Sequence, residues 1–278
     1  FDPSFPDGYS LTWLLTDGID RDGMGGECGN YGRRWALRMV NFPALLAKYP
    51  DYTQHDLVAE FPKLKQCFLI NPLLMCLDAA MPAYGDRGAP GVWARPGSAT
   101  TFAIGYKLYK EQRMANVAWR YAEGNPQALR LDDDIFEADP DALMNEIAEV
   151  AQEEEFKLRC EHLGRQGQLV LQTEEPDAAT GRAIWMVFGY GLGHRHKDAL
   201  NLGLYAKNMD MLPDMGYPEY TGRWPKRRCW TSNSVSHNTL VVNDARQDGA
   251  NRGGQITLFA CEPPVRVTEV SAPEDDVS

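Results

Sequence analysis

The sequence predicts an α+β protein in which a helical region is followed by an antiparallel β-sandwich. Before residue 164, short apolar segments with helical spacing alternate with glycine-rich loops. After Gly164 the chain consists of short β-rich runs separated by Gly, Pro and Asp. We therefore expect two domains, residues 1–163 and 164–278. We also expect the chain to be truncated at both ends, because it begins with Phe1 and stops a few strands into the sandwich.

The helical region begins with a loop rich in glycine and aspartate over residues 1–32, and a second glycine-rich loop covers residues 81–91. Long ordered loops often carry function. Helices are predicted at residues 33–49, interrupted by Pro43, at 56–78, at 99–112 after a Ser98 cap, and at 114–121. Asp139 and Pro140 are predicted to begin the last helix, whose acidic side chains form a solvated face.

The β-rich runs occupy residues 167–175, 182–193, 198–206, 238–244 and 255–260. Their spacing is typical of an antiparallel sandwich. The segment AIWMVF, residues 183–188, is apolar at every position, so we predict that it lies in the middle of a sheet.

Composition excludes several classes of function. The chain has 278 residues, 44% of them hydrophobic, which is enough for one large or two ordinary domains. The formal net charge of -11 argues against nucleic acid and membrane surfaces as partners. It would also repel a polyanion unless positive charge is concentrated locally. No stretch is long and apolar enough to cross a bilayer.

Six cysteines are scattered along the chain without paired spacing. Cys67 and Cys76 fall in a predicted apolar helix, where a free buried thiol is the common state. An even number of cysteines permits disulfides but assigns no pair.

The run from residue 198 to residue 205 carries a candidate site at its start. Leu200, Leu202 and Leu204 share one face of an extended strand, because side chains repeat every two residues. Carried backwards, the same face presents Asp198, His196 and His194. A packed, hydrogen-bonded histidine is the alternative interpretation of His194.

His196, Asp214 and His237 form a chemically sensible set of metal ligands. Imidazole nitrogens and a carboxylate oxygen bind Zn²⁺ in tetrahedral sites. Asp214 ends a predicted strand, and His237 opens another, SHNTLVV, whose Leu240, Val241 and Val242 are expected to be buried. Adjacent strands would bring the three ligands together. The alternative is that they hydrogen-bond to the backbone and hold loops.

The segments GHRHKD, PDMGYPEY and SHNTLVV, in this order, resemble the C-terminal sandwich of the heparinase II/III-like polysaccharide lyases, which include alginate and glycosaminoglycan lyases. The resemblance implies an incomplete α/α toroid followed by the sandwich, with an acidic polysaccharide bound in the cleft between them. It implies a structural zinc on His196, Asp214 and His237, and a cleft position for His194. It also implies a periplasmic or secreted protein.

DGMGGECGNY, residues 22–31, resembles the toroid segment of that family, whose tyrosine is catalytic. This implies a catalytic Tyr31 with Glu27 as a cleft acid. A second tyrosine is expected at Tyr217 or Tyr220, and we prefer Tyr220. The alternative is that Tyr31 only anchors a helix. The resemblance implies that the family's carboxylate-neutralising Asn or His lies upstream of this chain, so we expect this polypeptide by itself to be inactive.

A lyase must neutralise a uronate carboxylate, remove the adjacent proton and protonate the leaving oxygen. Tyrosine serves in this chemistry when a nearby cation lowers its pKa from about 10. The basic segment TGRWPKRR, residues 221–228, suits a polyanion, because guanidinium groups bind carboxylates or sulfates and tryptophan stacks on sugars. We expect Arg223, Trp224 and Arg227, together with Arg195, to bind substrate. The alternative is a solvated loop.

The sequence thus favours an enzyme that cleaves an acidic polysaccharide by β-elimination. An α-toroid glycoside hydrolase is a second possibility, with Glu27 opposed by Asp22 or Asp86. A third is a non-catalytic carbohydrate-binding relative that keeps zinc for stability.

Overall fold

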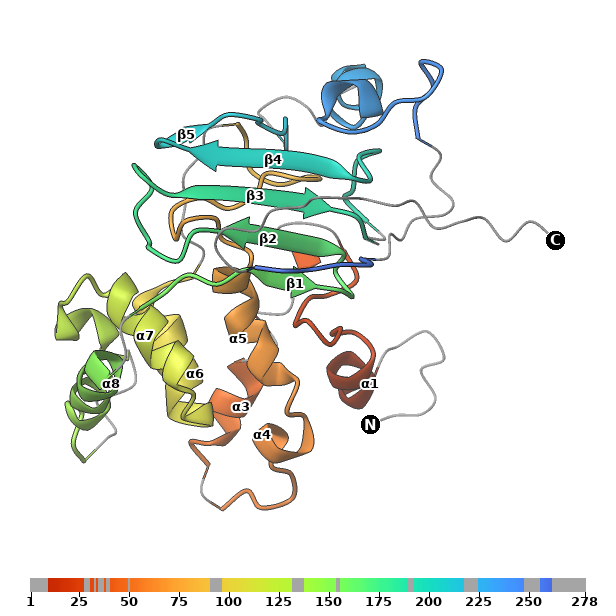
Figure 1. Ribbon diagram of the computed structural model, residues 1–278. Helices are drawn as coiled ribbons and strands as arrows, with labels where there is room; N and C mark the ends of the chain where they lie inside the picture. The colour runs from red at the N-terminus through yellow and green to blue at the C-terminus, as the bar shows by residue number, and fades with distance from the viewer. Residues whose placement is uncertain are drawn as a thin grey trace.

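A computed structural model gives a fold in which a twisted antiparallel sheet stands beside a group of short helices (Figure 1). The described residues are 10–27, 31–32, 34, 38, 41–49, 51–90, 97–131, 138–153, 156–189, 193–217, 225–247 and 256–261. The general prediction of helices followed by antiparallel strands is confirmed. The toroid, the sandwich and the domain boundary stay predictions.

The helices are α1 (Leu11–Thr16), α3 (Asn41–Leu46), α4 (Leu57–Glu60), α5 (Leu64–Leu73), α6 (Ala99–Tyr109), α7 (Gln112–Tyr121) and α8 (Ala142–Glu153), with a 3-10 turn η1 (Pro126–Leu129). Helices α5, α6, α7 and α8 share one hydrophobic core. No helix in the described part of the chain is long and apolar enough to span a membrane.

Local signals explain several helix ends. The Ser98 side chain accepts a hydrogen bond from the amide of Thr101 at 3.2 Å, which confirms the predicted cap of α6. Pro43 lies in the first turn of α3, where its missing N–H is tolerated, so it does not interrupt this helix. Helix α8 begins at Ala142, later than predicted. Asp139 instead accepts from the amide of Asp141 in the preceding turn.

The five strands are β1 (Glu161–Leu163), β2 (Gln168–Gln172), β3 (Arg182–Val187), β4 (Asn201–Ala206) and β5 (Met209–Asp210). They pair antiparallel in the order of the chain. Strand β3 is central, as its apolar sequence predicted. Its Trp185 pairs with Gly203 of β4, and the indole ring occupies the space where a side chain at Gly203 would lie.

One face of the sheet packs on the loop that follows α5. Val170, Trp185 and Tyr205 are buried there against residues 76–84. On the opposite face, Ile184 of β3 and Met209 of β5 remain 39% and 52% exposed. The chain from 76 to 90 therefore lies against this face of the sheet. It places polar groups near the start of β4.

The prediction of a strand at SHNTLVV is wrong. Residues 234–236 form a 3-10 turn (η4, Ser234–Ser236), and the following residues are irregular. Leu240 and Val242 are 68% and 60% exposed, because among the described residues no strand covers them and Val242 forms only an isolated bridge with Ala245. The described part of QITLFA, residues 256–260, also forms no strand.

The predicted extended face from residue 194 to residue 204 is only partly correct. Leu202 and Leu204 share a face of β4, but the strand begins at Asn201. His194 and Leu200 have positive φ angles of 57° and 64°, so the chain turns before the strand. The two histidines are therefore presented by a loop.

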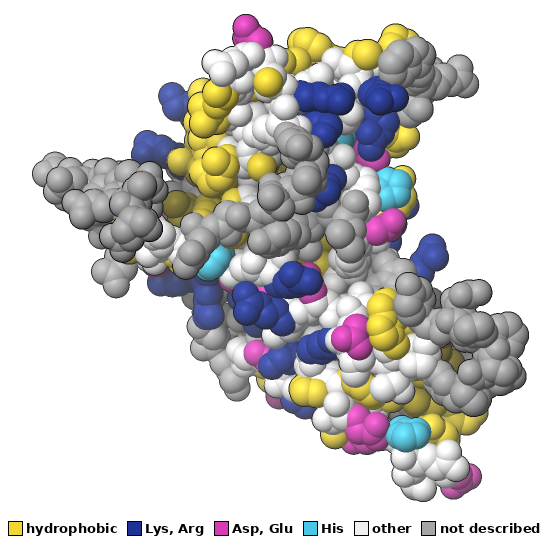
Figure 2. Space-filling view, turned by 90° about the vertical axis from the view of Figure 1, so that its right-hand side faces the viewer, with side chains coloured by type: hydrophobic (Ala, Val, Ile, Leu, Met, Phe, Trp, Pro, Cys, Tyr) yellow, Lys and Arg dark blue, Asp and Glu magenta, His cyan; other side chains and the backbone are white. Residues whose placement is uncertain are grey.

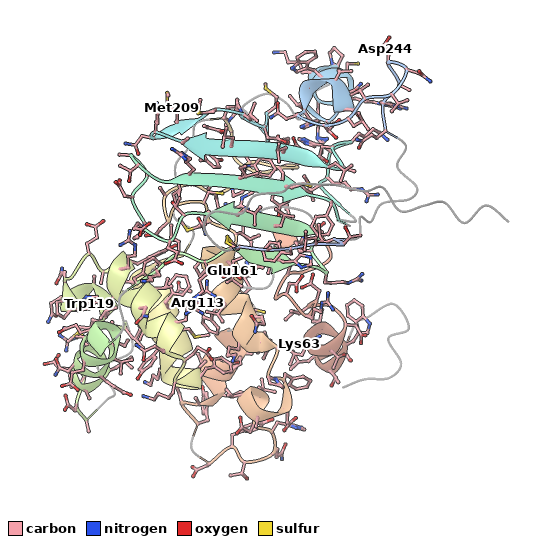
Figure 3. The ribbon with its side chains drawn as sticks, viewed as in Figure 1. Lys63, Arg113, Trp119, Glu161, Met209 and Asp244 are labelled. Carbon is pink, nitrogen blue, oxygen red and sulfur yellow. A yellow bond between two sulfur atoms is a disulfide. The ribbon has the colours of Figure 1, made fainter. Side chains whose placement is uncertain are left out.

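Side-chain contacts join the helices to the sheet. Arg113 of α7 forms an ion pair of 2.6 Å with Glu161 of β1, and Figure 3 shows the two labelled side chains at this boundary. The carboxylate of Asp22 accepts hydrogen bonds from the amides of Arg165 and Gln166 in the β1–β2 turn at 2.7 and 2.8 Å. The loop around residue 22 is thereby held against the sheet.

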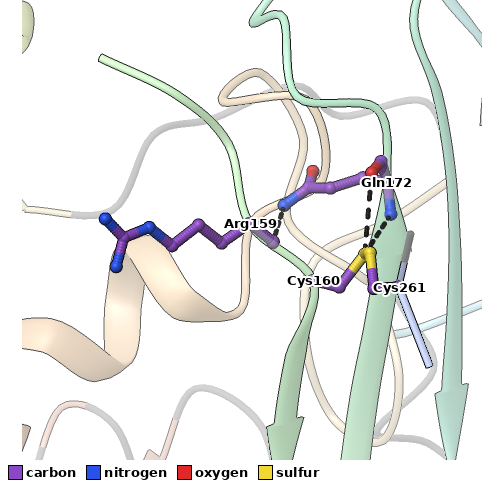
Figure 4. Close-up of a disulfide and its surroundings, with 4 residues drawn as sticks. All are labelled: Arg159, Cys160, Gln172 and Cys261. Atoms are coloured by element: carbon purple, nitrogen blue, oxygen red, sulfur yellow. Dashed lines mark hydrogen bonds between the residues drawn. A yellow bond between two sulfur atoms is a disulfide. The ribbon is translucent and has the colours of Figure 1, made fainter. Parts of the chain in front are cut away.

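A disulfide joins Cys160 to Cys261, with 6.1 Å between their Cα atoms (Figure 4). The backbone amide of Gln172 in β2 donates to the sulfur of Cys160 at 3.3 Å. This pairing, which the sequence left open, ties the segment 256–261 to the sheet edge. Cys67 and Cys76 are free and buried, as predicted.

Candidate functional site

Three buried side chains beside the first residue of β4 form a candidate metal centre. His196, Asp214 and His237 are 2%, 1% and 8% exposed, and each offers a ligand atom within 4.8 Å of the others. His196 lies in the loop before β4, Asp214 follows β5, and His237 follows η4. The structure thus brings together the three residues that the sequence selected, although all three come from loops rather than strands.

Hydrogen bonds hold Asp214 in place. It accepts from the side-chain amide of Asn201, from the backbone amide of Gly216 at 2.6 Å, and from Nδ1 of His237 at 2.9 Å. Burial by itself would lower the pKa of His237, but the hydrogen bond and the negative charge of Asp214 raise it above its usual value. The Asp214 carboxylate therefore stabilises a positive charge next to it.

Several buried polar atoms in this cluster have no hydrogen-bond partner in the described part of the chain. They are Nδ1 of His196, Nε2 of His237 and Oδ2 of Asp198. Burial, and then the charge of Asp214, raise the pKa of Asp198. Buried polar atoms without partners are costly. Two unpaired imidazole nitrogens beside carboxylates fit a site for a divalent cation with nitrogen and oxygen ligands.

Asp86 lies next to this centre and contacts both histidines of the HRH segment. Its Oδ1 is 3.0 Å from Nε2 of His196, and its Oδ2 is 3.0 Å from Nδ1 of His194. Arg227 completes the cluster with an ion pair to Oδ2. Burial would raise the pKa of Asp86, but the hydrogen bonds from the two histidines and the charge of Arg227 outweigh it and lower this pKa.

His194 faces Tyr31, which lies in a helical turn. The rings of Tyr31 and His194 are stacked, with centroids 3.5 Å apart and an interplanar angle of 9°. Nε2 of His194 is 3.8 Å from Oε1 of Glu27. Tyr31 and Glu27 are exposed, whereas Asp86 is buried. His194 therefore contacts the exposed Tyr31 and also the buried carboxylate of Asp86.

Tyr220, Arg223 and Trp224 lie outside the described residues. Tyr217 is 39% exposed, and the guanidinium carbon of Arg227 lies 5.9 Å from the centre of its ring. Arg195 is partly buried. Arg227 begins a short π-helical turn, η3 (Arg227–Thr231), and its ion pair with Asp86 fixes it against the cluster, so it is not a solvated loop residue. Figure 2 shows groups of Lys and Arg side chains across one face of the molecule.

The sequence pattern does not place Asp86 in this cluster and offers it only as an acid for a glycoside hydrolase. The available signal was an Asp-Arg pair between Gly85 and Gly88, in a loop that carries little other polarity.

Residues 179–272 match the family model of the heparinase II/III-like C-terminal domain. This match covers all three motifs that carried the resemblance and confirms it. No curated protein matches the chain.

Two solved structures illustrate the likeness of the fold. A heparinase III with methylated lysines is 13% identical, with a TM-score of 0.61 over 91% of this chain and 34% of that chain. A mutant of the heparan sulfate lyase HepC from Pedobacter heparinus is 13% identical, with a TM-score of 0.54 over 85% of this chain and 32% of that chain. The present chain therefore spans about a third of their length.

Proposed function

We propose, on the premise that residues 179–272 are a heparinase II/III-like C-terminal domain, that the protein is a polysaccharide lyase for a uronic-acid-containing polymer. The observation that carries the proposal is the stacked contact between Tyr31 and His194. It places Tyr31 of the helical region against His194 of the HRH loop, and Tyr31 is exposed there.

The reaction is a β-elimination. A base removes the proton beside the uronate carboxylate, and the electron pair forms a double bond between C4 and C5. The bond from C4 to the glycosidic oxygen breaks, and an acid protonates that oxygen. Tyr31 and His194 are the proposed proton-transfer pair. A phenol and an imidazole can each give a proton to the substrate or take one from it, and the two rings are in contact, so both can act on the same side of the substrate. Tyr220 is a proposed third participant.

Substrate binding is proposed for Glu27, Arg195 and Arg227, together with Arg223 and Trp224. The formal net charge of -11 opposes a polyanion, so local arginines are needed to attract it. Arg227 lies between Asp86 and the ring of Tyr217, which keeps a positive charge beside His194.

A structural zinc is proposed on His196, Asp214 and His237, with the unpaired imidazole nitrogens as its main support. A bound ion would cross-link the three loop segments that carry these ligands. His194, two residues before His196, would then lie at the edge of a rigid cluster.

The contacts of the acidic residues favour a lyase over a glycoside hydrolase. A hydrolase needs two opposed carboxylic acids that reach the sugar. Asp22 accepts hydrogen bonds from two amides of the β1–β2 turn, and Asp86 is buried among histidines and Arg227. Neither is an accessible partner for Glu27.

The proposed location is periplasmic or secreted. Disulfides persist in oxidising compartments, and Cys160 and Cys261 are bonded.

The test uses full-length protein with alginate, heparan sulfate, chondroitin, hyaluronan and ulvan. Elimination produces a conjugated unsaturated uronate, so ultraviolet absorbance should rise with one of these polymers. Tyr31→Phe and His194→Ala should each lower kcat by about 10²–10⁴-fold, the range of acid–base catalysis.

Two exposed residues provide matched controls. Tyr52 is as exposed as Tyr31, both at 38%, and His55 pairs only with Glu60 among the described residues. Tyr52→Phe and His55→Ala should retain full activity. Full turnover in the Tyr31 and His194 variants would refute the assigned roles. Binding of a polymer without unsaturated product would favour the non-catalytic carbohydrate-binding relative.

A further inference from the structure

Asp86 belongs to the helical region by sequence but packs against the loops of the sheet region. Its backbone amide donates to the carbonyl of His194 at 2.7 Å, and the carbonyl of nearby Gly88 accepts from the amide of Tyr217 at 2.8 Å. Both the backbone and the side chain of this loop are therefore fixed by the segments that carry the candidate site.

We propose that Asp86 is a positioning residue that couples the cleft histidine His194 to the metal ligand His196. Each oxygen of its carboxylate contacts one of the two imidazoles at 3.0 Å. The inference rests on the proposed function for the role of His194, but its effect on His196 concerns the metal centre alone.

The two contacts set the tautomers of the rings. A carboxylate is an acceptor, so each histidine donates from the nitrogen that faces it. His194 then carries hydrogen on Nδ1, which leaves Nε2 on the side of Glu27. His196 carries hydrogen on Nε2, which leaves Nδ1 as its metal-binding nitrogen. That atom is one of the buried atoms without a partner in the described chain.

The coupling follows from the shared carboxylate. Asp86 is 5% exposed, and Arg227 balances its charge. A carboxylate that accepts from a metal-bound histidine fixes the ring orientation and raises its basicity as a ligand. Because the Asp86 carboxylate also holds His194, a change at the metal centre alters the orientation of the His194 ring, which stacks on Tyr31.

Asp86→Asn separates this role from simple packing. The asparagine has nearly the same shape, but its amide nitrogen cannot accept a hydrogen bond, so only one histidine keeps its acceptor. In the full-length protein, zinc affinity should fall about 10–100-fold. At saturating zinc, kcat should still fall about 10–100-fold while KM changes less than about twofold.

Asp78→Asn is the matched control. The side chain of Asp78 is also 4% exposed and pairs with an arginine, Arg120, outside the candidate site. Its positive φ of 51° suits asparagine. This variant should lose stability but keep wild-type zinc affinity and kcat. An Asp86→Asn protein that matches Asp78→Asn in zinc affinity, or regains wild-type kcat at saturating zinc, would overturn the proposal.

NMR of the zinc-loaded wild type with ¹⁵N-labelled histidine tests the same point without a variant or a turnover assay. The expected signals are Nδ1–H for His194 and Nε2–H for His196, and the opposite tautomer at either residue refutes the coupling. Absence of lyase activity with correct tautomers and a lowered zinc affinity in Asp86→Asn would reject the proposed function and leave the positioning role intact.

Discussion

Individual residues at the candidate site are held by contacts that few substitutions can preserve. Asp214 receives three hydrogen bonds, one of them from the backbone of Gly216. Gly216 has a positive φ of 56°, and a Cβ there would collide with the carbonyl oxygen of Arg87. A glycine beside the aspartate is therefore a requirement of the site as well as of the turn.

We predict that Gly216→Ala weakens zinc retention and stability together. A left-handed alanine costs about 1–2 kcal/mol, and the collision with Arg87 adds to this because backbone must move. Gly124→Ala is the matched control, since Gly124 has a φ of +74° and open space around its Cβ position. Denaturant unfolding and zinc content after dialysis measure the difference. Equal stability losses with unchanged zinc content would contradict this account.

At the level of elements, the proposed ligands come from segments with little regular structure. The described residues 225–247 contain η3, η4 and one isolated bridge, and residues 211–217 contain no strand. Side-chain hydrogen bonds hold these segments to β4, such as the one from the amide of Asn238 to the side chain of Asn201 at 3.1 Å. An ion would supply the cross-link that strand pairing does not.

Removal of the metal should therefore loosen these segments first. At a free zinc concentration 1,000 times the Kd, binding contributes about 4 kcal/mol, which corresponds to a shift in Tm on the order of 10 °C. Chelation should lower Tm by that order and speed amide hydrogen exchange in residues 231–247 more than in β3. A His237→Ala variant should not respond to the chelator. Uniform exchange after chelation would argue against a local structural ion.

Over the whole molecule, a few long-range connections join the helical region to the sheet and close its edge. The ion pair between Arg113 and Glu161 crosses the boundary, and the disulfide joins Cys160, directly before β1, to Cys261, 101 residues later. Phe259 of that segment lies near His162 of β1, with ring centroids 5.5 Å apart. Cys261 is thus held at the sheet edge by packing as well as by the covalent bond.

The disulfide should contribute strongly to stability. Cross-linking residues about 100 positions apart stabilises by at most about 4–5 kcal/mol in the chain-entropy description. Cys160→Ser should lower Tm, and a reductant should lower the Tm of the wild type to the value of this variant. Cys229→Ser provides the control, because Cys229 is free and exposed. A wild-type Tm that is insensitive to reductant would count against the bond.

Local sequence was sufficient for features that depend on periodicity and residue type. The order of helices and strands, the central place of β3 and the Ser98 cap follow from these signals. The grouping of His196, Asp214 and His237 was predicted from residue type and from the family resemblance, and not from strand periodicity, since all three lie outside strands. The irregular chain around Leu240 was not, because strand formation depends on a neighbour to pair with. Asp86 contacts His194 across 108 residues and Cys160 bonds to Cys261 across 101, and such contacts leave no periodic trace in a single sequence. The contacts of Asp86 arise when the chain after α5 packs against the sheet, because burial there brings its carboxylate within hydrogen-bonding reach of the loop before β4. The disulfide forms where the segment 256–261 lies against the sheet edge.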